Sequence, residues 1–160
     1  MRLTPSFTLA EFATSASHAD LVRPVPAELQ SYVRLLCLLG LEPLRQAMGY
    51  PLRVLSGYRS VELNKAVGGS STSQHALAQA ADVTSAAGAE RMFRWLLRVQ
   101  PVGIGQVIYY PAQQFVHVAL VSAQHPTFRG FVSRQPKQYT VVPNERELDA
   151  LLGTPAVVTV

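Results

Sequence analysis

Apolar residues recur every three or four positions along residues 26–48, which is the spacing of one face of an α-helix. Pro26 suits a helix start and Gly49 a helix end. Pro43 lacks the backbone N–H that a helix interior needs, so it predicts a kink or a division. We therefore expect a core helix, interrupted near Pro43, whose buried face is formed by Leu29, Val33, Leu36, Cys37, Gly40 and Leu44.

Shorter stretches rich in branched and aromatic residues predict β-strands over 51–55, 102–110 and 115–121, with a further short strand ending near Thr84. Strands 102–110 and 115–121 are separated only by residues 111–114, so we expect an antiparallel pair. Helices are expected over 61–67, where Ser60 can cap the start, and over 87–99, whose apolar stripe is core.

Structural signals weaken beyond Val121. His125, Arg129 and Arg134 are expected in loops, residues 138–142 form a candidate edge strand, and a capping box at 144–147 predicts a short helix through Leu152. The order of elements predicts an α+β fold: a single domain over 1–160, with a small, mainly antiparallel sheet and helices packed on one side.

Composition agrees with one globular domain, because 48% of the 160 residues are hydrophobic and 15% are charged. No apolar run reaches the ~18–20 residues of a transmembrane helix, and the first residues lack a signal-peptide core, so we expect a product made in the cytoplasm. The net charge of +4 suits an acidic surface or polymer. Nucleic-acid binding is disfavoured, since no stripe of arginines alternates with aromatics. The single cysteine, Cys37, is predicted to be a small core residue.

The most informative stretch is 73–82, which places His75 and Asp82 seven residues apart among small or apolar neighbours. Asp82 stands between Ala81 and Val83. Burial of an unpaired carboxylate costs several kcal/mol, so Asp82 needs a cation, hydrogen-bond donors or water beside it. A metal ion would meet that need.

A second histidine, His117, lies in the strand predicted over 115–121 and shares one face of it with Phe115 and Ala119. Two imidazoles and a carboxylate that leave a fourth position to water form the open set of catalytic zinc sites. His75, Asp82 and His117 are therefore candidate ligands of Zn2+, although nickel or cobalt would accept them too. Two other interpretations stay open: a hydrogen-bonded core histidine in the strand, and a solvated His75.

Several ordered segments are similar to the M15 zinc peptidases, and the branch of D-Ala-D-Ala carboxypeptidase-like domains of bacteria and phages is the nearest. The resemblance covers about residues 7–120. It is carried by Phe7–Phe12, Leu44-Arg45, Ser56–Ser60, Leu63–Ser70, Ser73–His75, Ala80–Val83, Gln106–Tyr109 and Val116–Val118.

The resemblance implies a zinc-dependent peptidase acting on a peptide of peptidoglycan. It implies that the zinc ion is held by His75, Asp82 and His117, that Arg59 stabilises the oxyanion, and that Ser73 lies near the substrate. Such a protein would act at the cell wall after lysis or as part of a virion, where phage structural proteins become possible partners.

Two departures from the family pattern matter, and the second concerns the proton-transfer group. Ala78 stands where glycine is usual. Tyr110 stands where this branch commonly has a glutamate, and Phe115 where other branches have a histidine, so the proton-transfer group is unidentified. Tyr110 can donate a hydrogen bond to an oxyanion but is a poor base at neutral pH, which makes it a substrate-binding candidate. Glu11, Glu62 or Glu90 would replace the glutamate only if the fold brought one to the metal.

Two hypotheses follow. In the first, the chain is an active zinc peptidase that cuts a D-amino-acid-containing bond. In the second, it is an M15-like module that has lost efficient catalysis and serves a structural or wall-binding role, for example in a phage particle.

Overall fold

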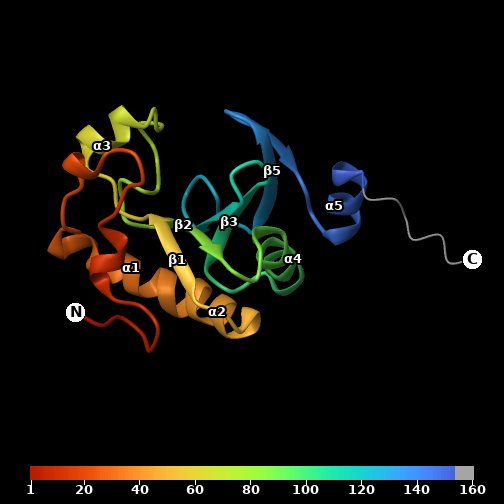
Figure 1. The fold of residues 1–160 in the computed structure, drawn as a ribbon, viewed down its shortest axis with the longest axis horizontal. Coiled ribbons are helices and arrows are strands. Elements are labelled where there is room, and N and C mark those ends of the chain that lie inside the picture. Colours follow the sequence, from red (N-terminus) through yellow and green to blue (C-terminus); the bar gives the residue numbers. More distant parts are fainter. Residues whose placement is uncertain (154–160) are drawn as a thin grey trace, which may run out of the picture.

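The computed structural model describes residues 1–153 and has the predicted α+β architecture, a single domain with one six-stranded sheet (Figure 1). None of the helices within this range is long and apolar enough to cross a bilayer. The helices are α1 (Gln30–Leu36), α2 (Glu42–Met48), α3 (Val61–Ala66), α4 (Ala89–Val99) and α5 (Glu145–Leu152). The strands are β1 (Leu52–Ser56), β2 (Ala80–Ser85), β3 (Ile104–Tyr110), β4 (Phe115–Leu120), β5 (Arg129–Gln135) and β6 (Gln138–Val141).

The sheet has the strand order β1-β2-β4-β3-β5-β6, and every neighbouring pair is antiparallel except β3 and β5. Side chains alternate between its two faces. One face packs against α1 and α4 and contributes Val116 and Val118 to the hydrophobic core. Asp82 and His117 belong to the opposite alternation, so they point away from those helices.

The helical segment before β1 is divided, as the sequence predicts. A π-helical turn, Cys37–Leu41, separates α1 from α2, and Pro43 follows at the start of α2. The wider turn accommodates a proline that can neither donate a backbone hydrogen bond nor tolerate a tight preceding turn. Cys37 is fully buried, and burial raises the pKa of its thiol to about 12, which suits a core residue rather than a nucleophile.

The loop predicted around Arg129 and Arg134 is wrong, because both residues belong to β5. This strand is polar at its ends, and its partner β3 lies parallel to it and remote in sequence. Its packing depends on Gly130, where a Cβ atom would lie 2.5 Å from Leu97 Cδ2. In Figure 1 the tip of the β5–β6 hairpin lies at the upper edge of the molecule with α3, whereas α1 and α2 run along the lower edge.

Candidate metal centre

Asp82 and His117 lie directly opposite each other on the neighbouring strands β2 and β4. Cross-strand partners on one face are close enough for their side chains to interact. The Nδ1 atom of His117 lies 2.9 Å from Oδ1 of Asp82. The sheet register alone therefore joins two of the three candidate ligands.

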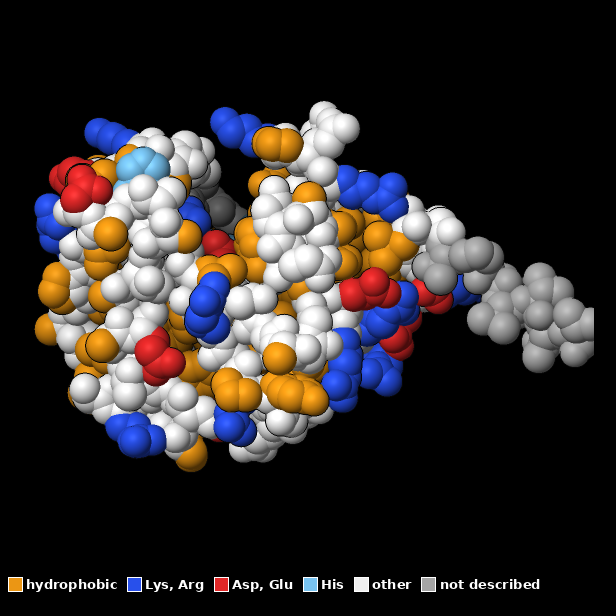
Figure 2. Space-filling model, in the orientation of Figure 1, with side chains coloured by type: hydrophobic (Ala, Val, Ile, Leu, Met, Phe, Trp, Pro, Cys, Tyr) orange, Lys and Arg blue, Asp and Glu red, His pale blue; other side chains and the backbone are white. Residues whose placement is uncertain are grey.

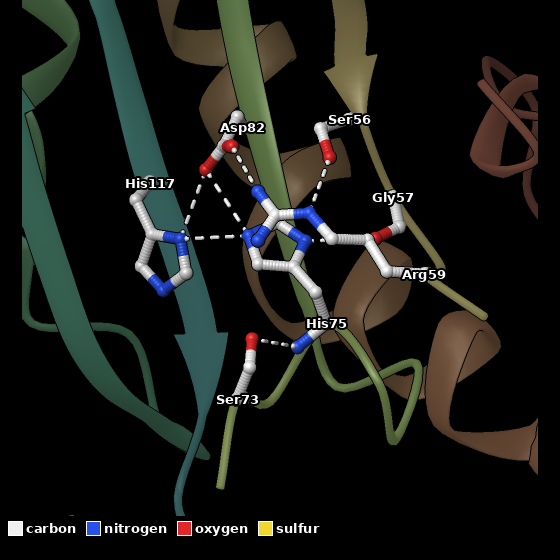
Figure 3. A network of polar contacts seen from close by, with 7 residues as sticks. All are labelled: Ser56, Gly57, Arg59, Ser73, His75, Asp82 and His117. Atoms are coloured by element: carbon white, nitrogen blue, oxygen red, sulfur yellow. Dashed lines mark hydrogen bonds and ion pairs between the residues drawn. The ribbon is translucent and has the colours of Figure 1, made fainter. Parts of the chain in front are cut away.

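His75 reaches the same point from the loop before β2. Its Nδ1 lies 2.7 Å from the carbonyl oxygen of Gly57, to which it donates, so its Nε2 presents a lone pair to Asp82 and His117 (Figure 3). The loop is closed by a hydrogen bond from Ala78 N to His75 O, and Ala78 adopts φ 55°. Glycine adopts this left-handed conformation most easily, in keeping with the glycine that the family resemblance leads one to expect, and here alanine occupies it.

The three ligand atoms have the spacing that zinc requires. Nε2 of His75 lies 3.2 Å from Nδ1 of His117 and 3.3 Å from Oδ1 of Asp82. Bonds of about 2.0–2.1 Å to a tetrahedral ion place neighbouring ligand atoms roughly 3.3 Å apart. The donor set and its geometry therefore fit a zinc ion with a fourth position open.

Electrostatics keeps two of these ligands in metal-binding form. Burial alone would raise the pKa of Asp82, but the two histidines outweigh it and hold that pKa well below its usual range. Burial lowers the pKa of the His117 imidazole, although the carboxylate of Asp82 opposes this. An ionised carboxylate and a neutral imidazole are the forms that coordinate a metal.

Arg59 lies beside the centre, just beyond the end of β1. Its guanidinium is 3.4 Å from Oδ2 of Asp82, on the carboxylate oxygen that does not face the histidines, and its Nε donates to Ser56 Oγ at 3.2 Å. Its backbone N–H donates to His75 O at 3.0 Å, so arginine and ligand loop are held together. The guanidinium is thus fixed next to the ligand set.

The centre lies in the wall of a cavity of about 740 Å³, a size typical of ligand sites. Figure 2 shows the surface hollowed between the part that carries α3 and the part that carries the β5–β6 hairpin. Arg59, Ser73 and Tyr110 also line the cavity, so all six residues singled out in the sequence meet there. Ser73 Oγ accepts the backbone N–H of His75 at 3.3 Å. The ring of Tyr110 stacks on Phe115, with centroids 4.4 Å apart.

Tyr110 is held as a hydrogen-bond donor. Burial, followed by the neighbouring Tyr139, raises the pKa of its hydroxyl, so the proton stays on the oxygen. Glu11, Glu62 and Glu90 do not line the cavity, and Asp82 is its only carboxylate among the described residues. None of the three glutamates therefore takes over the unassigned proton-transfer role.

Part of the cavity wall was not predicted from the sequence. His125 had no motif around it, and Phe131 belongs to β5, the strand that was predicted as a loop. Lys137 lies in the turn before β6, and Tyr139 belongs to β6, which was predicted as an edge strand but not as part of a site. The residues concerned are Gln106, Gln124, His125, Phe131, Lys137 and Tyr139.

A histidine, aspartate, histidine set with one open position, beside a fixed arginine in a cavity, defines a candidate mononuclear metal centre suited to hydrolysis. The sequence profile of the Peptidase M15 family matches residues 5–119, and the chain belongs to this family. The match confirms the resemblance inferred from the motifs. No curated protein matches the chain.

Proposed function

We propose that this protein is a zinc-dependent peptidase that hydrolyses a D-amino-acid-containing peptide bond of peptidoglycan. The observation that carries the proposal is the convergence of three ligand atoms, 2.9–3.3 Å apart, in the wall of a cavity that also contains Arg59. Membership of the M15 peptidase family supports peptide hydrolysis as the reaction.

A zinc ion bound by His75, Asp82 and His117 would polarise the scissile carbonyl and lower the pKa of a bound water. The guanidinium of Arg59 would stabilise negative charge on the carbonyl oxygen as the water adds. Tyr110, which keeps its proton, would donate a hydrogen bond to the same oxygen or to the peptide. Ser73 would contribute a hydroxyl at the rim of the cavity.

The charge of the cavity supports a peptide with a free carboxylate as substrate. Arg59 and Lys137 are cationic, and Asp82 is the only acidic side chain among the described lining residues. Arg59 is already paired with Asp82, whereas no ion pair of Lys137 occurs within residues 1–153. A peptide ending in D-alanine would place its carboxylate near these cationic side chains. We propose the cell wall, reached after lysis or from a virion, as the place of action.

The direct test is mass spectrometry of purified muropeptides incubated with the zinc-loaded protein. We expect zinc-dependent loss of D-alanine or cleavage of one defined peptide bond. His117→Ala should abolish the reaction, and His18→Gln, which changes a histidine outside the cavity, should leave it intact.

A second function is favoured by one observation, the presence of Tyr110 where the family branch commonly has a glutamate. In this alternative the chain is a lapsed module that keeps its metal and binds wall peptide or phage structural proteins without cutting. Intact muropeptides, after incubation with a protein that holds one zinc per chain, would support the alternative over the peptidase.

A further inference from the structure

Peptide hydrolysis needs a group that accepts a proton from the attacking water and returns one to the leaving amine. If the protein has the proposed function, a residue of the cavity must supply this group. Tyr110 is unsuited to the task, because its raised pKa keeps the proton on its hydroxyl.

The side chains of the cavity wall leave one candidate. His75, Asp82 and His117 are the proposed ligands. Arginine, lysine and tyrosine side chains hold their protons near neutral pH and therefore cannot act as bases there. Among the described residues that line the cavity and can titrate, namely Arg59, His75, Asp82, Tyr110, His117, His125, Lys137 and Tyr139, this leaves His125.

His125 is held in place by a tight turn after β4. Ser122 N donates to His125 O at 3.0 Å, and His125 N donates to Ser122 O at 3.1 Å. The turn lies directly on Gly105 of β3, where a Cβ atom would be 2.5 Å from His125 O and 2.7 Å from Val121 Cα. Glycine at 105 therefore permits the close approach of the turn that carries the half-buried His125, which lines the cavity as Gln106 does.

The surroundings of His125 favour its neutral form. Burial lowers the pKa of its imidazole, and the nearby His117 of β4 and Arg129 of β5 act in the same direction. A neutral imidazole has one nitrogen free to accept a proton, which is the state that a general base must have at the start of a reaction.

We propose that His125 is the proton-transfer residue of this site, in place of the glutamate that the family branch commonly carries. Its imidazole takes one proton from the water whose oxygen bonds to the carbonyl carbon. The imidazolium then gives that proton to the amide nitrogen as the carbon–nitrogen bond breaks. The products are an amine and a carboxylic acid, which loses its remaining proton to solvent at neutral pH, and the imidazole returns to its neutral form.

The test compares zinc-loaded wild type, His125→Gln and His18→Gln on an N-acylated peptide ending in D-Ala-D-Ala. We expect His125→Gln to lower kcat at least about 100-fold, with KM and zinc content near those of wild type. The acidic limb of the kcat/KM pH profile should disappear in this variant and persist in His18→Gln. Wild-type kcat and an unchanged pH profile in His125→Gln would overturn the proposal.

A second readout does not depend on turnover. NMR titration of the zinc-loaded protein should show the pKa of the His125 ring rising when a phosphinate dipeptide analogue is added, because its oxygens carry charge where the water oxygen would be. The ring of His18 should not respond. An unaffected His125 ring would reject its role, whereas failure of wild type to cut any peptide would reject the proposed function itself.

Discussion

At the scale of single residues, Tyr110 offers the cavity a hydrogen-bond donor rather than a base. Its hydroxyl keeps its proton and lies in the cavity wall with Arg59. Tyr110→Phe removes that donor while preserving the stacking on Phe115, so we expect kcat to fall about 100-fold. Steady-state kinetics on the zinc-loaded variant measures this.

Tyr50→Phe, at an exposed tyrosine outside the cavity, is the matched control and should retain wild-type kcat. A Tyr110→Phe protein with wild-type kcat would show that the hydroxyl stabilises no charge in the transition state.

The carboxylate of Glu42, at the start of α2, binds the amino-terminal residues of the chain through hydrogen bonds. Thr4 Oγ1 donates to its carboxylate at 2.6 Å and Ser6 Oγ at 2.7 Å. Burial alone would raise the pKa of Glu42, but the hydrogen bonds from Ser6 and Thr4 lower it. A carboxyl whose pKa is lower in the folded protein stabilises the fold above its unfolded pKa, and this contribution is lost as the pH falls through the folded pKa.

We therefore expect Glu42→Gln to lower the free energy of unfolding by about 1–3 kcal/mol at pH 7. The difference from wild type should shrink as the pH falls below about 4. Urea denaturation over pH 3–7 measures it, with the exposed Glu28→Gln as control. A difference that stays constant over this range would contradict the assigned role of the carboxylate.

At the scale of elements, the end of β1 orients a ligand that belongs to another segment. Gly57 accepts the Nδ1–H of His75, and a Cβ atom at 57 would lie 2.5 Å from the backbone oxygen of Phe12. Gly57→Ala must therefore shift backbone, and with it the carbonyl that fixes the imidazole. We expect a 10–100-fold loss of zinc affinity, the usual effect of disturbing a partner of a metal ligand.

Competition with a chromogenic chelator measures that loss. Gly49→Ala is the control, because Gly49 has φ 72° and open space around it. That substitution should strain the backbone yet keep zinc affinity. Equal affinities in Gly57→Ala and wild type would mean that the Gly57 carbonyl does not orient His75.

At the scale of the whole molecule, the features that the sequence predicts are those that depend on neighbouring residues in the chain. The antiparallel pair β3 and β4 is joined by a short connection, and the division near Pro43 follows from a missing N–H. The three ligand types could be proposed from residue chemistry, and the family resemblance added Arg59. Their convergence depends on a register and a loop closure that no spacing along the chain reveals.

The part of the cavity wall that includes His125 and the β5 residue Phe131 could not be predicted either, because it also depends on contacts between residues distant in sequence. β5 pairs with β3 in parallel across a long connection, and its local pattern resembles a loop. His125 gains meaning only because its turn lies on Gly105, a contact between positions 20 residues apart. Residues without a local motif, such as His125, acquire a role only through long-range packing, so they could not be predicted from the sequence.

Metal content is the most immediate measure of whether His75, Asp82 and His117 bind one zinc ion. Elemental analysis of the full chain, after incubation with zinc and removal of excess, should give one zinc per chain. His117→Ala should lower zinc affinity more than about 100-fold while its circular dichroism stays that of wild type. A wild-type protein without zinc, or a folded His117→Ala protein that binds zinc as wild type does, would contradict a zinc site formed by these three residues.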